Sequence, residues 1–216
     1  RTIVLVGNPN VGKSALFSRL TGTNVITSNF PGTTLSVTRG TLEIRRGGVD
    51  YAFELIDIPG LYSLTETTET ARRGARFIIE QADIVINVVD ATNLKRNLYL
   101  SFQLLALRRP TIMALNMYDE AGYHGITINT PLLSEKLSCP VIATAGISGF
   151  GISKLIDALV RLPMTTAEPN HSSVDWPAIT ELVSTVQSAK KRRKRFREHL
   201  ATLSVHPLWG TVLAFS

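Results

Sequence analysis

The chain has one cysteine, few aromatic residues and no long hydrophobic run. Of its 216 residues only Cys139 is a cysteine, so no disulfide can form within the chain, which suits a reducing compartment. Cys139 lies in an apolar stretch before Pro140, and we expect its thiol to pack in the core. No apolar run reaches the ~18 residues that a membrane-spanning helix needs.

The sequence also lacks a Ser/His/Asp pattern and any cluster of metal ligands. Its four histidines (124, 171, 199 and 206) are scattered, and we expect them to be solvated. No signal peptide precedes the first strand, so we expect the chain to be a fragment of a longer protein. Residues 207–215 are apolar and stop abruptly. They are interpreted as the first half of a membrane helix, or alternatively as a short buried or fraying tail.

The net charge of +6 comes from one local run of basic residues. Seven of the 23 Lys and Arg residues lie at 190–197, which leaves 16 against 17 Asp and Glu. The body of the chain is therefore near neutral. Three interpretations of the run stay open: a solvated helix face, a cytoplasmic patch that contacts anionic lipid, or a nucleic-acid patch. Of these, we consider nucleic acid the least favoured.

The strongest motif is a glycine-rich loop near the N-terminus that ends in Lys-Ser. It follows an apolar run over 2–6, which predicts a buried strand, and it precedes a helical pattern over 15–20. In the Gly-x-x-x-x-Gly-Lys-Ser loop, backbone amides cradle phosphates, the lysine pairs with the β- and γ-phosphates, and the serine ligates Mg²⁺. A glycine-rich turn that occurred by chance would explain neither the strand pattern before the loop nor the helical pattern after it. We predict nucleotide binding by Gly7, Asn8, Pro9, Asn10, Val11, Gly12, Lys13, Ser14 and Ala15.

Strand and helix patterns alternate along the rest of the chain. Buried strands are predicted at 84–89, 111–115 and 140–143, helices at 71–80, 94–107, 131–137 and 152–162, and a hairpin of strands 35–44 and 51–56 around Arg46-Gly47-Gly48. This alternation indicates right-handed βαβ crossovers. We predict an α/β, three-layer P-loop GTPase fold. It has a mostly parallel six-stranded sheet with one antiparallel strand pair, and a small helical segment follows it.

We expect three parts in the chain. Residues 1–162 form the G domain, and 163–203 form a linker and a short helical segment, helix-prone over 176–203, that carries the basic run. Residues 204–216 would begin a truncated transmembrane helix. Within the first part, residues 22–33 are rich in Thr, Asn, Pro and Gly, which predicts a mobile loop.

Two further motifs follow buried strands. Asp57-Ile58-Pro59-Gly60 ends one strand, where the carboxylate would hold Mg²⁺ through water and the glycine amide would sense a γ-phosphate. Asn116-Met117-Tyr118-Asp119 ends another, where the carboxylate would accept the N1–H and amino group of guanine. Each alone would fit a simple turn, but the ordered set of motifs favours a guanine-nucleotide site. Thr144-Ala145-Gly146 is a weaker signal, whose amides would face the guanine carbonyl.

Two details concern hydrolysis. A hydroxyl from Thr33 or Thr34 should join Ser14 on Mg²⁺ when a γ-phosphate is present, and we include Gly32, Leu35 and Ser36 in the same nucleotide-facing stretch. Position 61, where many GTPases place a glutamine that orients water, is Leu. Another group must therefore position the water, or intrinsic hydrolysis is slow.

With these residues in view, the chain resembles the cytoplasmic GTPase domain of the FeoB family of bacterial ferrous iron transporters. The resemblance rests on Gly7–Asn10, Asn29–Thr34, Asp57–Leu64, Asn87–Leu100 and Asn116–Asp119, and the 87–100 match is the most discriminating. It covers roughly residues 1–162, is weak over 163–203, and returns at His206–Gly210, which looks like the beginning of the family's first transmembrane helix.

The resemblance implies a function and a location. The domain would bind GTP with Mg²⁺ and hydrolyse it to GDP, as part of a protein that carries Fe²⁺ across the bacterial inner membrane. It would lie on the cytoplasmic face, next to the transporter's own transmembrane domain, with small Feo accessory proteins as further partners. Nucleic acid is not an expected partner, and the resemblance leaves the oligomeric state open.

The resemblance also implies roles for single residues. Asn10 would ligate a K⁺ ion, together with carbonyls around 23–29, and Thr34 would be the switch threonine on Mg²⁺. The catalytic set would then be Asn10, Lys13, Thr34 and Gly60. The family has a helical domain after the G domain that helps to hold GDP; here that region is short and carries the basic run. Ala145 stands where the family more often has Ser, a departure that bears on GDP retention.

Two other functions compete with this interpretation. A soluble GTPase of ribosome assembly would use the basic run on RNA, although such proteins usually have Lys where this chain has Met117. A nucleotide switch without significant hydrolysis would explain Leu61.

Overall fold

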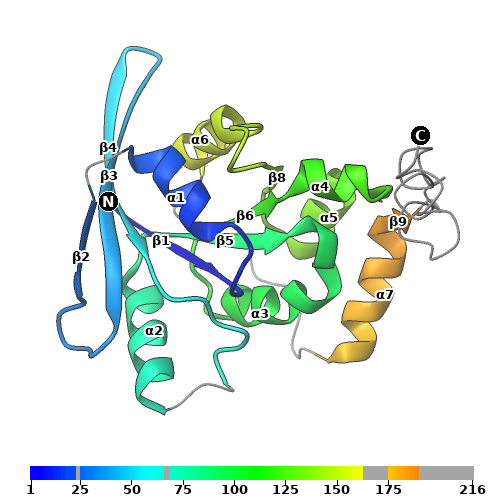
Figure 1. Ribbon diagram of the computed structural model, residues 1–216, viewed down its shortest axis with the longest axis horizontal. Coiled ribbons are helices and arrows are strands. Elements are labelled where there is room, and N and C mark those ends of the chain that lie inside the picture. Colours follow the sequence, from blue (N-terminus) through cyan, green and yellow to red (C-terminus); the bar gives the residue numbers. More distant parts are fainter. Residues whose placement is uncertain (23–24, 66–68, 163–174, 190–216) are drawn as a thin grey trace, which may run out of the picture.

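A seven-stranded sheet forms the centre of the molecule (Figure 1). The computed structural model describes residues 1–22, 25–65, 69–162 and 175–189. The strand order is β2-β3-β4-β1-β5-β6-β8. These strands are β1 (Thr2–Gly7), β2 (Val25–Asn29), β3 (Ser36–Arg46), β4 (Val49–Asp57), β5 (Ile84–Asp90), β6 (Thr111–Asn116) and β8 (Val141–Ala143).

The pairing of the strands is mostly parallel, as predicted. Strand β1 pairs in parallel with β4 and β5, and β6 pairs in parallel with β5 and β8. The predicted hairpin is the antiparallel β3–β4 pair, whose turn projects beyond the rest of the sheet (Figure 1). The strand count of six was wrong by one: β2, inside the stretch expected to be a mobile loop, adds a second antiparallel pairing along β3.

Helices cover both faces of the sheet and give the predicted three layers. Helices α1 (Lys13–Thr21) and α6 (Ile152–Arg161) lie on one face, and α2 (Glu69–Gln81) and α3 (Leu94–Ala106) lie on the other (Figure 1). A short 3₁₀ turn, η1 (Ala91–Asn93), precedes α3, and α4 (Tyr118–Tyr123) and α5 (Thr130–Leu137) follow β6. The central strands are apolar on both faces because both are covered: every residue of β6 is buried.

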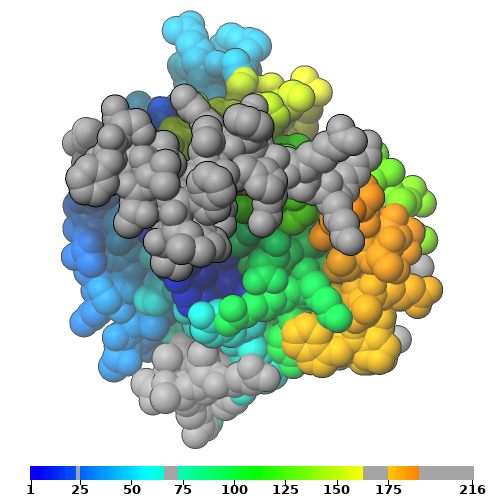
Figure 2. Space-filling model, turned by 45° about the vertical axis from the view of Figure 1, so that its right-hand side comes forward, coloured from blue at the N-terminus to red at the C-terminus, as the bar shows by residue number. Residues whose placement is uncertain are grey.

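The segment after the G domain packs against it. Helix α7 (Trp176–Val186) lies against α3, where the rings of Trp176 and Tyr99 stack at a centroid distance of 5.1 Å. In Figure 2 it borders the green middle of the chain, which includes α3. The helix-prone stretch expected over 176–203 ends earlier than predicted, because β9 (Gln187–Ala189) is a strand that pairs antiparallel with β7 (Ile126–Ile128).

Several sequence predictions fall partly or wholly outside the described residues. The basic run at 190–197, the apolar C-terminus and three of the four histidines lie there, and so do residues 163–174, the first part of the expected linker. His124, the fourth histidine, is exposed as expected. Within the described ranges no helix is long and apolar enough to cross a bilayer, and no group of three metal-ligating side chains occurs. Cys139 is 6% exposed, which confirms that it belongs to the core.

Candidate nucleotide site

The loop between β1 and α1 has the shape that its glycines allow. Residue Gly12 lies in the left-handed region at a φ of 77°, directly before the first residue of α1. A Cβ atom at this position would come within 2.4 Å of the Asn116 amide nitrogen, so only glycine fits. Helix α1 therefore begins at Lys13, with its N-terminal amides at the loop. This is the strand–loop–helix arrangement that binds phosphate.

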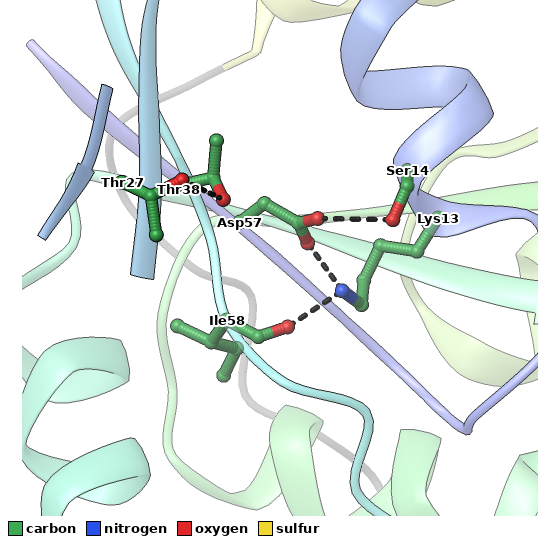
Figure 3. Close-up of polar contacts among 6 residues, drawn as sticks. All are labelled: Lys13, Ser14, Thr27, Thr38, Asp57 and Ile58. Atoms are coloured by element: carbon green, nitrogen blue, oxygen red, sulfur yellow. Dashed lines mark hydrogen bonds and ion pairs between the residues drawn. The ribbon is translucent and has the colours of Figure 1, made fainter. Parts of the chain in front are cut away.

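Three predicted residues meet at the start of α1. Figure 3 shows Lys13 and Ser14 pointing toward Asp57, which ends β4. The Lys13 ammonium forms an ion pair with the Asp57 carboxylate and donates to the Ile58 carbonyl at 2.5 Å. The Ser14 hydroxyl donates to the other Asp57 oxygen at 3.4 Å. The glycine-rich loop and the Asp57–Gly60 motif thus form one cluster, although more than 40 residues separate Lys13 from Asp57.

The electrostatics of this cluster are those of a partly buried ion pair. Burial raises the pKa of the Asp57 carboxyl above its ordinary value, and the nearby Lys13 charge and hydrogen bonds lower it only in part. The lysine side chain is 10% exposed, so its charge is little screened by water. A cation held in this position is suited to pairing with phosphate oxygens.

The guanine motif is tied to the glycine-rich loop by Asn116. This side chain is 2% exposed, and its amide nitrogen donates to the Val11 carbonyl at 2.8 Å. Its amide oxygen accepts from the Gly146 amide at 2.9 Å and from the Thr144 hydroxyl at 3.2 Å. One buried amide therefore connects three segments that the sequence analysis placed in the site. Ala145 lies between the two contacts and is buried.

Gly60 lies against the first turn of the glycine-rich loop. A Cβ at this position would come within 2.8 Å of Pro9 backbone atoms, so a larger residue would push the two segments apart. The next residue, Leu61, donates its amide to the Gly7 carbonyl at 3.0 Å, and its side chain is 4% exposed. The structure thus fixes the backbone here and turns the Leu61 side chain into the core.

Three predicted residues are exposed, and within the described part of the chain their side chains form no hydrogen bond to the other predicted residues. Asn10 is exposed at a φ of 65°, and Asp119 is exposed with its carboxylate accepting from the Glu120 amide at 3.0 Å. Thr34 is exposed in the stretch between β2 and β3. The adjacent Thr33 hydroxyl is instead engaged locally, because it donates to the Phe30 carbonyl at 3.1 Å and accepts from the Leu35 amide at 3.2 Å.

The remaining predicted residues have mainly backbone roles. Met117 lies in the left-handed region at a φ of 56°, which turns the chain from β6 into α4. The Tyr118 amide donates to the Thr144 carbonyl at 3.1 Å and adds to the link made by Asn116. Gly32 has a φ of 79°, and Ser36 begins β3. Asn8 is 4% exposed, and its amide oxygen has no hydrogen-bond partner among the residues that the structure describes.

One residue that supports the site was not predicted. Arg19 of α1 donates to the Gly146 carbonyl at 3.1 Å and to the Ile147 carbonyl, and so holds the loop after β8. No sequence signal points to it, because a single arginine on an exposed helix position is typical of any soluble protein.

Comparison with known proteins identifies the family. The model of the family described as "Ferrous iron transport protein B" matches residues 1–159. The chain belongs to the FeoB family. Residues 87–100, on which the resemblance most depended, lie within this match and form most of β5, η1 and the first half of α3.

The relatives with known sequence are much longer than this chain. The chain is 43% identical over 165 residues to the Fe(2+) transporter FeoB of Escherichia coli strain K12, covering 74% of this chain and 21% of the relative. It is 35% identical over 194 residues to a FeoA/FeoB fusion protein of Porphyromonas gingivalis, covering 86% of this chain and 22% of the relative. The chain thus spans about a fifth of the length of these relatives.

Solved structures of FeoB domains share the fold. The cytosolic domain of L. pneumophila FeoB is similar over 87% of this chain and 100% of its own, with a TM-score of 0.76 and 29% identity. A GDP-bound A143S mutant of the S. thermophilus FeoB G-domain is 36% identical, covers 80% of this chain and 64% of its own, and has a TM-score of 0.66. The chain is therefore an N-terminal G domain of the FeoB type with a P-loop GTPase fold.

Proposed function

We propose that this domain binds GTP with Mg²⁺, hydrolyses it to GDP and phosphate, and serves a ferrous iron transporter from the cytoplasmic face of the bacterial inner membrane. The observation that carries the proposal is the cluster of Lys13, Ser14 and Asp57 at the start of α1. Its connection through Asn116 to the guanine motif supports guanine nucleotides in particular. The GDP-bound S. thermophilus relative is consistent with this specificity.

The residues of the chain divide the work of binding. Lys13 would neutralise the β- and γ-phosphates, and the amides at the start of α1 would surround the phosphate oxygens. The Asp119 carboxylate is exposed at the guanine motif, and one of its oxygens accepts from the Glu120 amide; we expect the other oxygen to accept from the base. The Gly60 amide would contact the γ-phosphate, and Thr34 would fold toward it.

The residues at Lys13 also fit a magnesium ion. Ser14 offers a hydroxyl and Asp57 a carboxylate, 3.4 Å apart, and Mg²⁺ prefers such hard oxygen ligands. We propose that these two residues and Thr34 hold the ion, with Asp57 acting through water. When bound, Mg²⁺ would neutralise charge on the phosphate oxygens.

The test is GTP turnover by this domain in KCl and in NaCl at equal ionic strength. We expect release of phosphate from GTP and none from ATP. Faster release in KCl, lost in Asn10→Ala, would support a K⁺ site at the exposed Asn10 amide. Equal rates in both salts would contradict the K⁺ site and leave Mg²⁺-dependent hydrolysis. Absence of phosphate release in either salt would contradict the proposed function itself.

The burial of Leu61 favours a second candidate, a nucleotide switch with negligible hydrolysis. Its side chain points into the core and cannot orient water. Single-turnover measurements distinguish the two functions, because a switch would leave GTP intact over hours in Mg²⁺ and K⁺.

We further propose that the transporter's own transmembrane domain, the inner membrane and small Feo accessory proteins are the partners of this domain. The basic run at 190–197 would contact anionic lipid. Cosedimentation with phosphatidylglycerol vesicles tests this contact, and binding that persists after the seven basic residues are changed to Gln would contradict it. Stronger, salt-dependent binding to RNA than to vesicles would favour the nucleic-acid interpretation.

A further inference from the structure

The segment Asp57–Leu64 is held at its far end by a side chain from α3. The Gln103 amide oxygen accepts from the Leu64 amide at 2.6 Å and lies 3.2 Å from the Ser63 hydroxyl. The Gln103 amide nitrogen donates to the same hydroxyl, also at 3.2 Å. The Ser63 side chain is fully buried and Leu64 is 8% exposed. Gln103 was not among the site residues predicted from the sequence.

The same segment is fixed at its near end by the glycine-rich loop. The Ile58 carbonyl accepts from Lys13, and the Leu61 amide donates to the Gly7 carbonyl. Gly60, which is exposed and lies close to Pro9, is between Ile58 and Leu61, and Gln103 holds the chain just beyond Leu61. The position of the Gly60 amide therefore depends on hydrogen bonds on both sides of it.

Backbone position matters here because residue 61 has no polar side chain. Leu61 packs with residues of α2 and α3, so its side chain is directed away from the phosphate site. Any contribution of residue 61 to hydrolysis must therefore come from its backbone. In an enzyme, a displacement of about 1 Å in a positioned group costs up to about 100-fold in rate.

We propose that Gln103 is a positioning residue for GTP hydrolysis: it holds Ser63 and Leu64 so that the Gly60 amide faces the γ-phosphate. This inference rests on the proposed function. Gln103 touches neither nucleotide nor water in this role, and it acts only through the backbone of the 57–64 segment. It should therefore affect the rate of the chemical step and leave nucleotide affinity unchanged.

The experiment compares two substitutions at this position. Gln103→Met keeps the length of the side chain but removes both hydrogen-bonding groups, whereas Gln103→Glu keeps oxygen acceptors for the Leu64 amide and the Ser63 hydroxyl. We expect the single-turnover rate of GTP cleavage to fall about 10- to 100-fold in Gln103→Met. It should stay within about threefold of wild type in Gln103→Glu, because its acceptors remain. Affinity for a fluorescent GDP should change by less than about threefold in both, since neither touches the nucleotide.

Ser101→Ala is the matched control. Ser101 lies on the same helix and is fully buried, whereas Gln103 is half-buried. The Ser101 hydroxyl accepts from the Asn87 amide of β5 at 2.6 Å and does not bond to the 57–64 segment. It should lower stability and leave the single-turnover rate unchanged. The inference is overturned if Gln103→Met cleaves GTP at the wild-type rate. It is also overturned if Gln103→Met and Ser101→Ala both lose cleavage rate and nucleotide affinity to the same extent. In either case the proposed function stands. A wild-type domain without cleavage would overturn both.

Discussion

Two neighbouring threonines have different surroundings, and this difference separates their roles. The Thr33 hydroxyl is used within its own turn, between the Phe30 carbonyl and the Leu35 amide. Thr34 is exposed, and among the described residues its hydroxyl has no hydrogen-bond partner. We therefore propose Thr34, and not Thr33, as the residue that joins a nucleotide-bound Mg²⁺, the role that the family resemblance implies.

This assignment predicts an asymmetric effect of substitution. Thr34→Ala should weaken binding of a non-hydrolysable GTP analogue with Mg²⁺ by about tenfold and leave the affinity for GDP unchanged. The reason is that the loop between β2 and β3 folds toward the nucleotide only when a γ-phosphate is present. Thr33→Ala should affect both nucleotides alike, through the turn. Titration with fluorescent nucleotides measures both effects. An equal loss for GTP analogue and GDP in Thr34→Ala would reject this role.

The cysteine provides a prediction on pH. Burial raises the pKa of the Cys139 thiol to about 12, against 9.0 for an exposed thiol. Below pH 9 the native protein should hold about a thousandfold less thiolate than the unfolded chain and react correspondingly slowly with a disulfide reagent. The native state disfavours the thiolate, so stability relative to Cys139→Ala should fall as pH rises from 9 toward 12. Fast labelling at pH 8 without denaturant would contradict the packed thiol.

At the scale of residues, the sequence predicted which side chains lie together in the candidate site but not which residues support them. Lys13, Ser14 and Asp57 were predicted because phosphate and Mg²⁺ chemistry restricts which residue types serve at those positions. The bridging role of Asn116 was not predicted, because its partners are distant in the sequence: the contacts with Val11 and Gly146 together span more than 130 residues of the chain. Gln103 was not predicted for the same reason: the segment that it contacts lies about 40 residues away in the sequence.

At the scale of elements, α7 contributes an apolar face to the core. Ile179 is fully buried and Val186 is 3% exposed, among residues of α3, α5 and β8. Ile179→Ala should therefore lower the free energy of unfolding by about 2–4 kcal/mol, by loss of burial and the cavity left behind. Urea unfolding measures this, with the exposed Glu181→Ala as a control expected to change it by less than about 0.5 kcal/mol. Equal effects would mean that α7 does not pack on the domain.

The elements that the sequence did not reveal are the short or exposed ones. The long helices and the buried strands β1, β5 and β6 were predicted because apolar periodicity marks them. All five residues of β2 are exposed, so no apolar alternation marks that strand, and only its pairing with β3 defines it. Strands β7 and β9 have three residues each and define one another across about 60 residues of chain. Such pairings are tertiary facts, which local pattern cannot show.

At the scale of the whole molecule, the predicted binding residues gather at one edge of the sheet. Apart from residues 32–36, which lie between β2 and β3 or begin β3, they follow β1, β4, β6 and β8, whose parallel arrangement brings their carboxyl ends to the same side. Asn116 and Lys13 already join these loops in pairs. A nucleotide bound across these loops would contact segments from both halves of the domain. None of the loops could then open without releasing the nucleotide.

Guanine nucleotides should therefore stabilise the whole domain and not only its loops. At about 100 times its dissociation constant, GDP with Mg²⁺ should add about 2.7 kcal/mol, a rise of about 5–10 °C in melting temperature, and ADP should add nothing. In Asp119→Asn the melting temperature should no longer rise with GDP and should rise with XDP instead, because an amide pairs with the xanthine carbonyl. Without nucleotide, Asp119→Asn should melt within about 2 °C of wild type, since among the described residues this exposed carboxylate bonds only to the Glu120 amide. If ADP raised the melting temperature as much as GDP, Asp119 would have no role in base recognition. The domain would then recognise only the phosphates of the nucleotide.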